Sequence, residues 1–215
     1  DINDANLQQL QISPQDIRLK GKFDLNLEAS SLSDMLGTAS IREATLYSNG
    51  KEINVDSLVV SSSYVDGLKR LRAVANEFDA TIDGDFDLAA LPDAFTLFLS
   101  RYYPAYITPP RSVKQQVFTF NISTGSVDDY VKLIDPRLSG FNNSHITGSL
   151  NTQANTMTVD ADIPYFSFRH YQFSDVQLKG NGDLDSLTLT GRTTNTQIGD
   201  SLFFPQTTFS ITARN

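Results

Sequence analysis

The sequence has no cysteine, no tryptophan and only two histidines among its 215 residues. Because cysteine is absent, disulfide bonds, thiolate zinc sites and cysteine nucleophiles are all excluded. His145 and His170 are 25 residues apart, and neither has a metal-ligating partner at the spacing of a zinc or iron site. We therefore interpret both as surface histidines and predict no metal site.

Motifs for catalysis are missing as well. The sequence contains no Gly-x-Ser-x-Gly elbow, no Gly-x-Gly-x-x-Gly phosphate fingerprint and no Walker loop. Nucleophilic and nucleotide chemistry both lack a candidate residue. We predict that the protein is not an enzyme and that it has no catalytic residue and no cofactor.

Positive charge is in deficit. Lys and Arg total 17 against 25 Asp and Glu, which gives a net charge of -8. This sign disfavours binding to phosphates along a nucleic acid, so we predict no nucleic-acid partner.

There is also no signal peptide and no run of about 18 apolar residues. The chain begins at Asp1 rather than at a methionine, so we interpret it as a fragment whose membrane contact is made only by parts outside it.

Three carboxylates lie close together at Asp83, Asp85 and Asp87. On one face of a strand they are a candidate for a calcium site or an acid and base pair. The same spacing is expected for the solvated face of a strand, and no glycine-bearing calcium loop follows. We prefer the solvated face.

The sequence does contain strict alternation of apolar and polar residues. From Ile17 to Ala29 every odd position is apolar or glycine and every even position is polar. The pattern returns from Phe78 to Leu88. A period of two predicts extended strands with one apolar and one wet face. Since 40% of the residues are hydrophobic, the chain has enough apolar surface to fold.

An internal repeat is predicted from an apolar-x-Gly triplet. Its glycines are Gly21, Gly84 and Gly148, which are 63 and then 64 residues apart. Repeats of this length are typical of stacked supersecondary units. We expect residues 1–215 to form a single elongated β-repeat segment with units of approximately 21–83, 84–147 and 148–215.

A helix is predicted over 91–103. Pro92 suits a first helical position, and Pro104 ends the segment. Its apolar stripe at i, i+3, i+4 and i+7 consists of Phe95, Phe98, Leu99 and Tyr102. We expect this helix either to lie across a groove as a lid or to cap exposed strands as part of the scaffold.

The remaining segments are assigned more coarsely. A second helix is predicted over 127–134 with Ser126 as N-cap, and 31–36 is helix-prone. The segment 68–76 is ambiguous between helix and strand. After Gly148 only strands are predicted, with a turn at 180–183, and they cover 157–163, 165–173, 176–178, 184–190 and 203–211.

The runs at 78–88, 98–104, 182–191 and 209–215 resemble the C-terminal half of TamB-like proteins, members of the AsmA-like family. The resemblance implies an all-β fold with short helical insertions, in which an elongated, repeat-built, curved sheet forms a U-shaped, β-taco-like groove with an apolar concave face. It also implies a periplasmic location, as part of an inner-membrane-anchored protein of Gram-negative bacteria.

The function implied by this resemblance is shielding or conduction of lipid acyl chains in outer-membrane biogenesis. The implied partners are phospholipid or another acyl-chain lipid and an Omp85-type outer-membrane barrel. The residues expected to bind lipid belong to the apolar phase of their strands, and they are Leu19, Phe23, Leu25, Leu27, Ile82, Phe86, Leu88, Phe118, Phe120, Ile122, Phe166, Phe168, Phe173, Leu187 and Leu189.

Two other interpretations stay open on the residues alone. One is a structural β-solenoid or sandwich that binds a protein partner or supports outer-membrane protein assembly, with its apolar face closed into a dry core. The other is a glycan-binding or carbohydrate-active β domain, which the absence of tryptophan disfavours. The three interpretations differ in whether an apolar ligand can reach the inner face.

Overall fold

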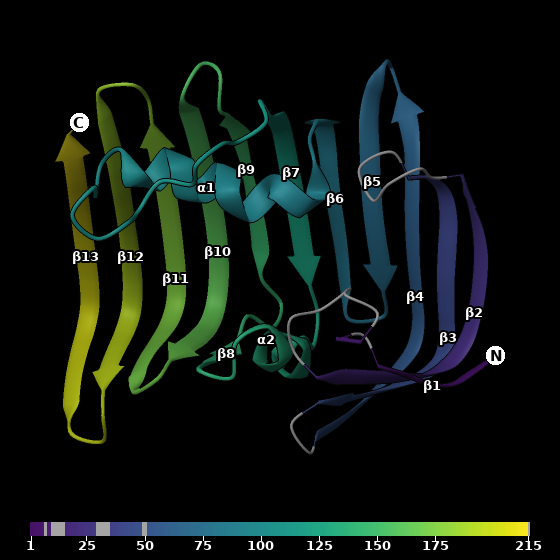
Figure 1. The fold of residues 1–215 in the computed structure, drawn as a ribbon. Helices are drawn as coiled ribbons and strands as arrows, with labels where there is room; N and C mark the ends of the chain where they lie inside the picture. Colours follow the sequence, from purple (N-terminus) through teal and green to yellow (C-terminus); the bar gives the residue numbers. More distant parts are fainter. Residues whose placement is uncertain (7, 10–15, 29–34, 49–50, 215) are drawn as a thin grey trace.

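The computed structural model describes residues 1–6, 8–9, 16–28, 35–48 and 51–214. These residues form one 13-stranded antiparallel sheet with two short α-helices (Figure 1). The predicted mostly-β fold with short helical insertions is therefore confirmed. The strands are β1 (Ile2–Asn6), β2 (Ile17–Glu28), β3 (Leu36–Ser48), β4 (Lys51–Val65), β5 (Leu68–Ala75), β6 (Phe78–Asp85), β7 (Val117–Thr124), β8 (Leu138–Gly140), β9 (His145–Asn151), β10 (Thr156–Phe168), β11 (Tyr171–Gly182), β12 (Ser186–Ile198) and β13 (Leu202–Arg214).

The strands lie side by side almost in sequence order. The sheet runs from β1 to β13, with β9 following β7 and the short β8 pairing with β10. It is neither closed nor strongly curled (Figure 1). Any groove on this sheet therefore needs the helices as walls.

Both α-helices lie on the same face of the sheet (Figure 1). Helix α1 (Leu91–Ser100) follows a 3-10 turn, η1 (Leu88–Ala90), and crosses the strands from β6 toward β12. Helix α2 (Asp128–Ile134) lies beside β8. The face that carries the helices is called the apolar face below.

The sequence placed the start of α1 correctly but the end of β6 wrongly. Pro92 lies in the first turn of α1, as predicted, and the helix ends at Ser100 rather than at residue 103. The preceding strand β6 ends at Asp85, because the Asp87 side chain accepts a hydrogen bond from the Ala89 amide at 3.1 Å and starts η1. The alternation predicts Phe86 and Leu88 as strand residues, and this prediction is wrong because both lie beyond the end of β6.

The predicted N-cap of α2 is wrong. Ser126 makes no cap; instead the Asn142 side-chain oxygen accepts hydrogen bonds from the Val127 and Asp128 amides at 2.7 and 3.0 Å. One amide oxygen thus satisfies two of the orphan donors at the helix start. The cap comes from a loop that follows β8, so α2 is fixed to the sheet at its first residue.

Other boundaries differ in smaller ways. The segment predicted as one strand over 165–173 is a hairpin, because β10 ends at Phe168 and β11 begins at Tyr171. The ambiguous segment 68–76 is strand β5, and the predicted turn at 180–183 begins only after Gly182. Most of the helix-prone segment 31–36 lies outside the described residues. The repeat glycines lie in β2, β6 and β9, and the repeat itself stays a prediction.

Candidate functional site

Three parallel rows of side chains cross the apolar face from β4 to β13. Residues directly paired in an antiparallel sheet point to the same side, so the strand register defines each row. Row 1 consists of Tyr64, Lys69, Gly84, Phe118, Leu150, Met157, Gly182, Leu187 and Ala213. Row 2 consists of Ser62, Leu71, Ile82, Phe120, Gly148, Val159, Gly180, Leu189 and Ile211. Row 3 consists of Val60, Ala73, Ala80, Ile122, Ile146, Ala161, Leu178, Gly191 and Phe209.

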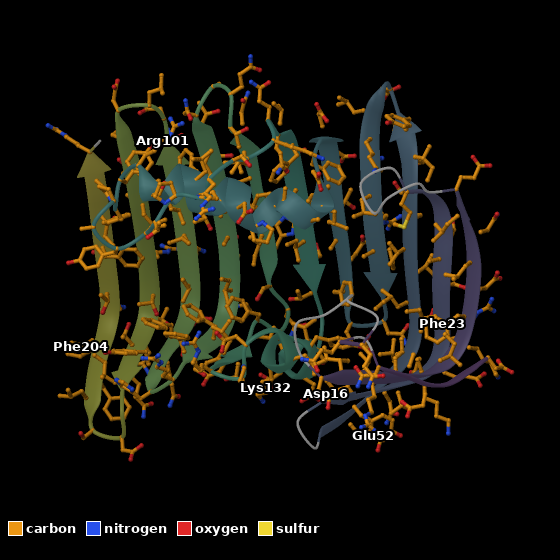
Figure 2. The ribbon with its side chains drawn as sticks, viewed as in Figure 1. Asp16, Phe23, Glu52, Arg101, Lys132 and Phe204 are labelled. Atoms are coloured by element: carbon orange, nitrogen blue, oxygen red, sulfur yellow. The ribbon has the colours of Figure 1, made fainter. Side chains whose placement is uncertain are left out.

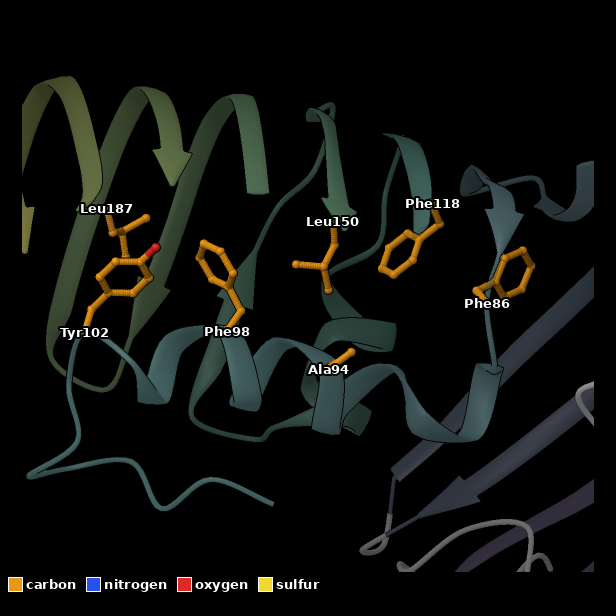
Figure 3. Packing of buried hydrophobic residues seen from close by; sticks show 7 residues of the cluster. All are labelled: Phe86, Ala94, Phe98, Tyr102, Phe118, Leu150 and Leu187. Carbon is orange, nitrogen blue, oxygen red and sulfur yellow. The ribbon is translucent and has the colours of Figure 1, made fainter. Parts of the chain in front are cut away.

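Helix α1 covers the part of row 1 that runs from β7 to β12. Phe98 is 2% exposed and Leu150 is 0% exposed, and both belong to one core cluster with Leu187 (Figure 3). The Tyr102 hydroxyl donates a hydrogen bond to the Asp183 backbone oxygen, and burial raises the pKa of this phenol. The last turn after α1 is thereby attached to the loop between β11 and β12.

Glycines in the rows make room for aromatic rings. A Cβ at Gly182 would meet the Phe98 ring at 2.5 Å, and a Cβ at Gly148 would meet the Phe120 ring at 2.5 Å. The rings lie where the sheet lacks side chains, which lets α1 approach closely and shields the strand backbone. The glycines are therefore part of the packing of the apolar face.

An apolar hollow remains between α1 and the strands β5 to β7. Its volume is about 270 Å³. Phe95 of α1 borders it, with its ring centroid 6.0 Å from that of Phe118 and 6.5 Å from that of Phe120. The residues that line the hollow are Leu71, Ala73, Ala80, Thr81, Ile82, Phe95, Phe118, Phe120 and Ile122.

Helix α2 packs against the lower part of the same face. The Tyr130 ring meets the Phe78 ring edge-on at 5.8 Å, and the Tyr130 hydroxyl donates to a Glu77 carboxylate oxygen at 3.2 Å. Burial, assisted by the nearby Glu77 charge, raises the pKa of Tyr130 to about 12. Tyr130 also packs on the cluster of Leu19, Ala44 and Val55 from β2 to β4.

The raised pKa of Tyr130 predicts a pH dependence of stability. Its folded pKa of about 12 lies above the value of about 10 expected in the unfolded chain. The stability that Tyr130 contributes is therefore complete below about pH 10 and is lost as the pH rises through about 12. We therefore expect the unfolding free energy of the wild type to fall relative to that of Tyr130→Phe as the pH rises from about 10 to about 12, as measured in denaturation curves. A difference independent of pH would contradict the half-buried position of this phenol beside Glu77.

The predicted lipid-binding residues are divided among several places. Those from β6, β7 and β12 meet on the three rows: Ile82, Phe118, Phe120, Ile122, Leu187 and Leu189. Phe86 flanks row 1, with its ring centroid 6.4 Å from that of Phe118, and Leu88 lies in η1. The four stripe residues of the predicted lid belong to the core beneath α1 or pack against it: Phe95, Phe98, Leu99 and Tyr102.

The structure does not bring the other predicted residues to the hollow. Leu19 and Phe23 belong to the cluster near α2, Leu27 is half-buried in β2, and Leu25 is 64% exposed. Figure 2 shows Phe23 near one edge of the sheet, across from Phe204 near the other.

The aromatic residues around the β10–β11 hairpin form a separate group. Phe166 stacks between Phe141 and Phe173 at centroid distances of 5.2 and 4.8 Å. The guanidinium groups of Arg137 and Arg169 lie 5.4 and 5.3 Å from the Phe168 ring centroid. The rings of Phe141, Phe166 and Phe173 pack on the cluster of Ala161, Ile163 and Val176, so they belong to a different part of the sheet from the hollow.

Sequence reasoning missed two parts of the hollow. Leu71 and Ala73 line it, but they lie in the segment left ambiguous between helix and strand. Lys69 precedes them on the same side of β5. Once the segment is taken as a strand, its period of two is the signal that places all three together.

The opposite face of the sheet is polar. Arg70 donates to Asp83 at 2.6 Å, and Arg72 donates to Asp79 at 2.5 Å. The Asp87 carboxylate, by contrast, accepts hydrogen bonds from Ala89 and from Lys114. Within the described part of the chain, no group of three His, Cys, Asp or Glu residues could hold a metal ion. Asp83, Asp85 and Asp87 are therefore not gathered into such a group.

The histidines lie apart from the hollow, with the His145 Nδ1 atom 3.1 Å from the Ser123 hydroxyl and the His170 ring packed on Tyr171. Among residues 1–6, 8–9, 16–28, 35–48 and 51–214, no helix has the length and hydropathy needed to cross a membrane.

No protein-family model, no curated protein and no solved structure matches this chain. The assignment of function therefore depends on the apolar face.

Proposed function

We propose that this chain shields or conducts lipid acyl chains along the apolar face of its sheet, as part of a periplasmic, inner-membrane-anchored protein that supports outer-membrane biogenesis. The observation that supports the proposal is the apolar hollow, which continues into rows 2 and 3. The resemblance to TamB-like proteins supports it independently. The proposed ligand is the acyl chain of a phospholipid or another lipid, and the proposed protein partner is an Omp85-type barrel.

The energy of an exposed acyl chain gives the physical reason for such a face. A chain of about fourteen methylenes at about 0.8 kcal/mol each loses on the order of 11 kcal/mol if it crosses water bare. A carrier must therefore offer continuous apolar contact. Strands are spaced about 4.8 Å apart, so rows from β5 to β13 extend roughly 34 Å. This is close to the hydrocarbon thickness of about 30 Å that two opposed acyl chains fill in a bilayer.

The helices supply the walls that the sheet does not form by curling. We infer a groove with rows 2 and 3 as its floor, α1 as its upper wall and α2 with β8 as its lower wall. This is a modified form of the U-shaped groove expected from the sequence. Phe95 is the α1 residue in contact with the hollow, so movement of α1 as a lid would change access to it.

A structural module for protein–protein interaction is the second candidate. Complete burial of Ala94 on α1 and of Leu150 beneath the helix favours it, because this part of the face is a dry core rather than a binding surface. Both functions can coexist on one sheet, since α1 covers Phe118, Leu150 and Leu187 of row 1 and leaves the apolar hollow beside them.

Filling the hollow tests the proposed function. Ala73→Phe places a ring in the hollow, so we expect its affinity for a fluorescent fatty acid to fall about tenfold or more, measured by fluorescence titration. The matched control is Val74→Phe, one residue along β5 and on the opposite face, which should bind as the wild type does. Equal binding by all three proteins, or no binding by the wild type, would contradict the proposal.

A further inference from the structure

An apolar row crosses the end of the sheet where the β10–β11 and β12–β13 hairpins turn (Figure 1). The two turns are joined by a hydrogen bond from the Gly199 amide to the His170 backbone oxygen at 2.9 Å. Strand register places one apolar side chain from each of β8, β10, β11, β12 and β13 side by side at this end. The end row consists of Leu138, Phe168, Tyr171, Ile198 and Leu202.

The β12–β13 hairpin exposes apolar side chains on both faces of the sheet. Leu202, Phe203 and Phe204 are consecutive, and they are 53%, 56% and 46% exposed. Successive residues of a strand point to opposite faces, so Phe203 lies on one side while Leu202 and Phe204 lie on the other. A run of three exposed apolar residues is unfavourable in water unless it has a contact to make.

The β10–β11 hairpin has the same exposure on two sides. Tyr171 of the end row is exposed. Tyr165 is also exposed, and its hydroxyl donates a hydrogen bond to the side-chain oxygen of Gln172 at 3.3 Å. Because Gln172 follows Tyr171 in the strand, it points to the opposite side. Exposed rings therefore lie on both sides of this end of the sheet.

Two cations lie beside the end row. The guanidinium groups of Arg137 and Arg169 both contact the face of the Phe168 ring. The acids at this end are Asp135, which accepts hydrogen bonds from Arg137, and Asp200 in the turn before β13. An Arg whose stem lies along apolar groups while its head reaches phosphate is typical of the interface of a bilayer.

We propose that this end of the sheet inserts into the surface of a phospholipid bilayer, with the rings of both hairpins in the interfacial region and the two guanidinium groups at the level of the lipid phosphates. A flat partner surface docked on one face would leave either Phe203 or Phe204 in water. A lipid surface surrounds both faces of the inserted strands, so it covers both rings. This contact is with a bilayer surface and not with a single acyl chain, so it goes beyond the proposed function.

Tryptophan reporters test the insertion on two sides, because the chain has no tryptophan of its own. The probe is a vesicle of phosphatidylcholine, a zwitterionic lipid that the net charge of -8 does not repel. We expect the emission of Phe203→Trp and of Phe204→Trp, made separately, to shift to shorter wavelength when vesicles are added. The control is Tyr106→Trp in the loop after α1, whose emission should not change. A shift at only one of the two hairpin positions would show docking on one face and overturn the inference.

Removal of the rings measures what they contribute. Phe203→Ser and Phe204→Ser should each weaken binding to the same vesicles by about tenfold or more in a flotation assay, because each removes apolar area that the lipid covers. The matched control is Tyr106→Ser, which removes an exposed ring elsewhere and should bind as the wild type does. Circular dichroism should show the same β spectrum for every variant. Equal binding by all four proteins would overturn the inference.

The outcomes also separate this inference from other occupants and from the proposed function. If the wild type does not bind vesicles, the inference is wrong. Self-association of the wild type that Phe203→Ser abolishes, measured by sedimentation, would then identify a second copy of the chain as the occupant. Fatty-acid binding in the apolar hollow should be the same in Phe203→Ser as in the wild type, so the two proposals can fail independently.

Discussion

Leu150→Asp is expected to lower the free energy of unfolding by about 4 kcal/mol or more. Leu150 is fully buried in row 1 between Phe118 and Met157, under α1. The substitution removes apolar contacts worth about 2–5 kcal/mol and buries a carboxylate with no cation among its row neighbours. Since a typical domain has only about 5–15 kcal/mol of net stability, the denaturation midpoint in guanidinium should fall steeply, as measured by circular dichroism.

The control for Leu150→Asp is the adjacent residue on the same strand. Ser149 points to the polar face, where its hydroxyl lies 2.7 Å from that of Thr158. Ser149→Asp introduces the same charge in water and should change stability by about 0.5 kcal/mol at most. If both variants unfold at the wild-type midpoint, row 1 is open to water and α1 does not cover it.

The strands could be predicted because their alternation is local. Arg18, Lys20 and Lys22 mark one face of β2, and Leu19 and Phe23 mark the other, so no tertiary information is needed to assign the strand. The position of these residues relative to the hollow could not be predicted. Leu19 and Phe23 lie far along the sheet from α1, because distance between strands depends on sheet order and not on residue type.

The contacts of the helices show a second limit. The apolar stripe of α1 identified the buried side of the helix, since Phe98 and Tyr102 are buried there. The cap of α2 could not be found in the same way. The local capping-box pattern predicts a hydrogen bond from a helix amide to the Ser126 side chain. In the fold, Asn142 accepts that kind of hydrogen bond instead, and it lies 14 residues beyond Asp128.

The position of Lys69 on the apolar face could not be predicted, because its neighbours obscure the pattern. Arg70 and Arg72 follow it, so charge occurs on both faces of β5 and the apolar phase is weak. Only the pairing of Lys69 with Gly84 shows which of these cations is on the apolar face. A single cation on an apolar face has no motif, and its position becomes visible only when strand register is known.

Phe98→Ala is expected to lower the free energy of unfolding by about 3–5 kcal/mol. The Phe98 ring is 2% exposed and lies 5.3 Å from the Tyr102 ring, so its removal leaves a cavity between α1 and the sheet. The control is Tyr106→Ala in the loop after α1, where the side chain is 89% exposed. This control should change stability by about 0.5 kcal/mol at most in the same denaturation experiment.

Coupling between Phe98 and Gly182 tests the position of α1 directly. In the wild type, the Cβ of Gly182→Ala would meet the Phe98 ring at 2.5 Å, so this substitution should cost about 1–3 kcal/mol. In the Phe98→Ala background the ring is absent and the added methyl group enters the cavity, so the cost should nearly disappear. The Leu187 Cδ1 atom also lies near the new Cβ, at 3.0 Å, and it is the end of a flexible side chain. A coupling energy of about 1–3 kcal/mol is therefore expected from the double-mutant cycle. Additive effects would mean that the helix is not seated over β11, and the upper wall of the proposed groove would be lost with it.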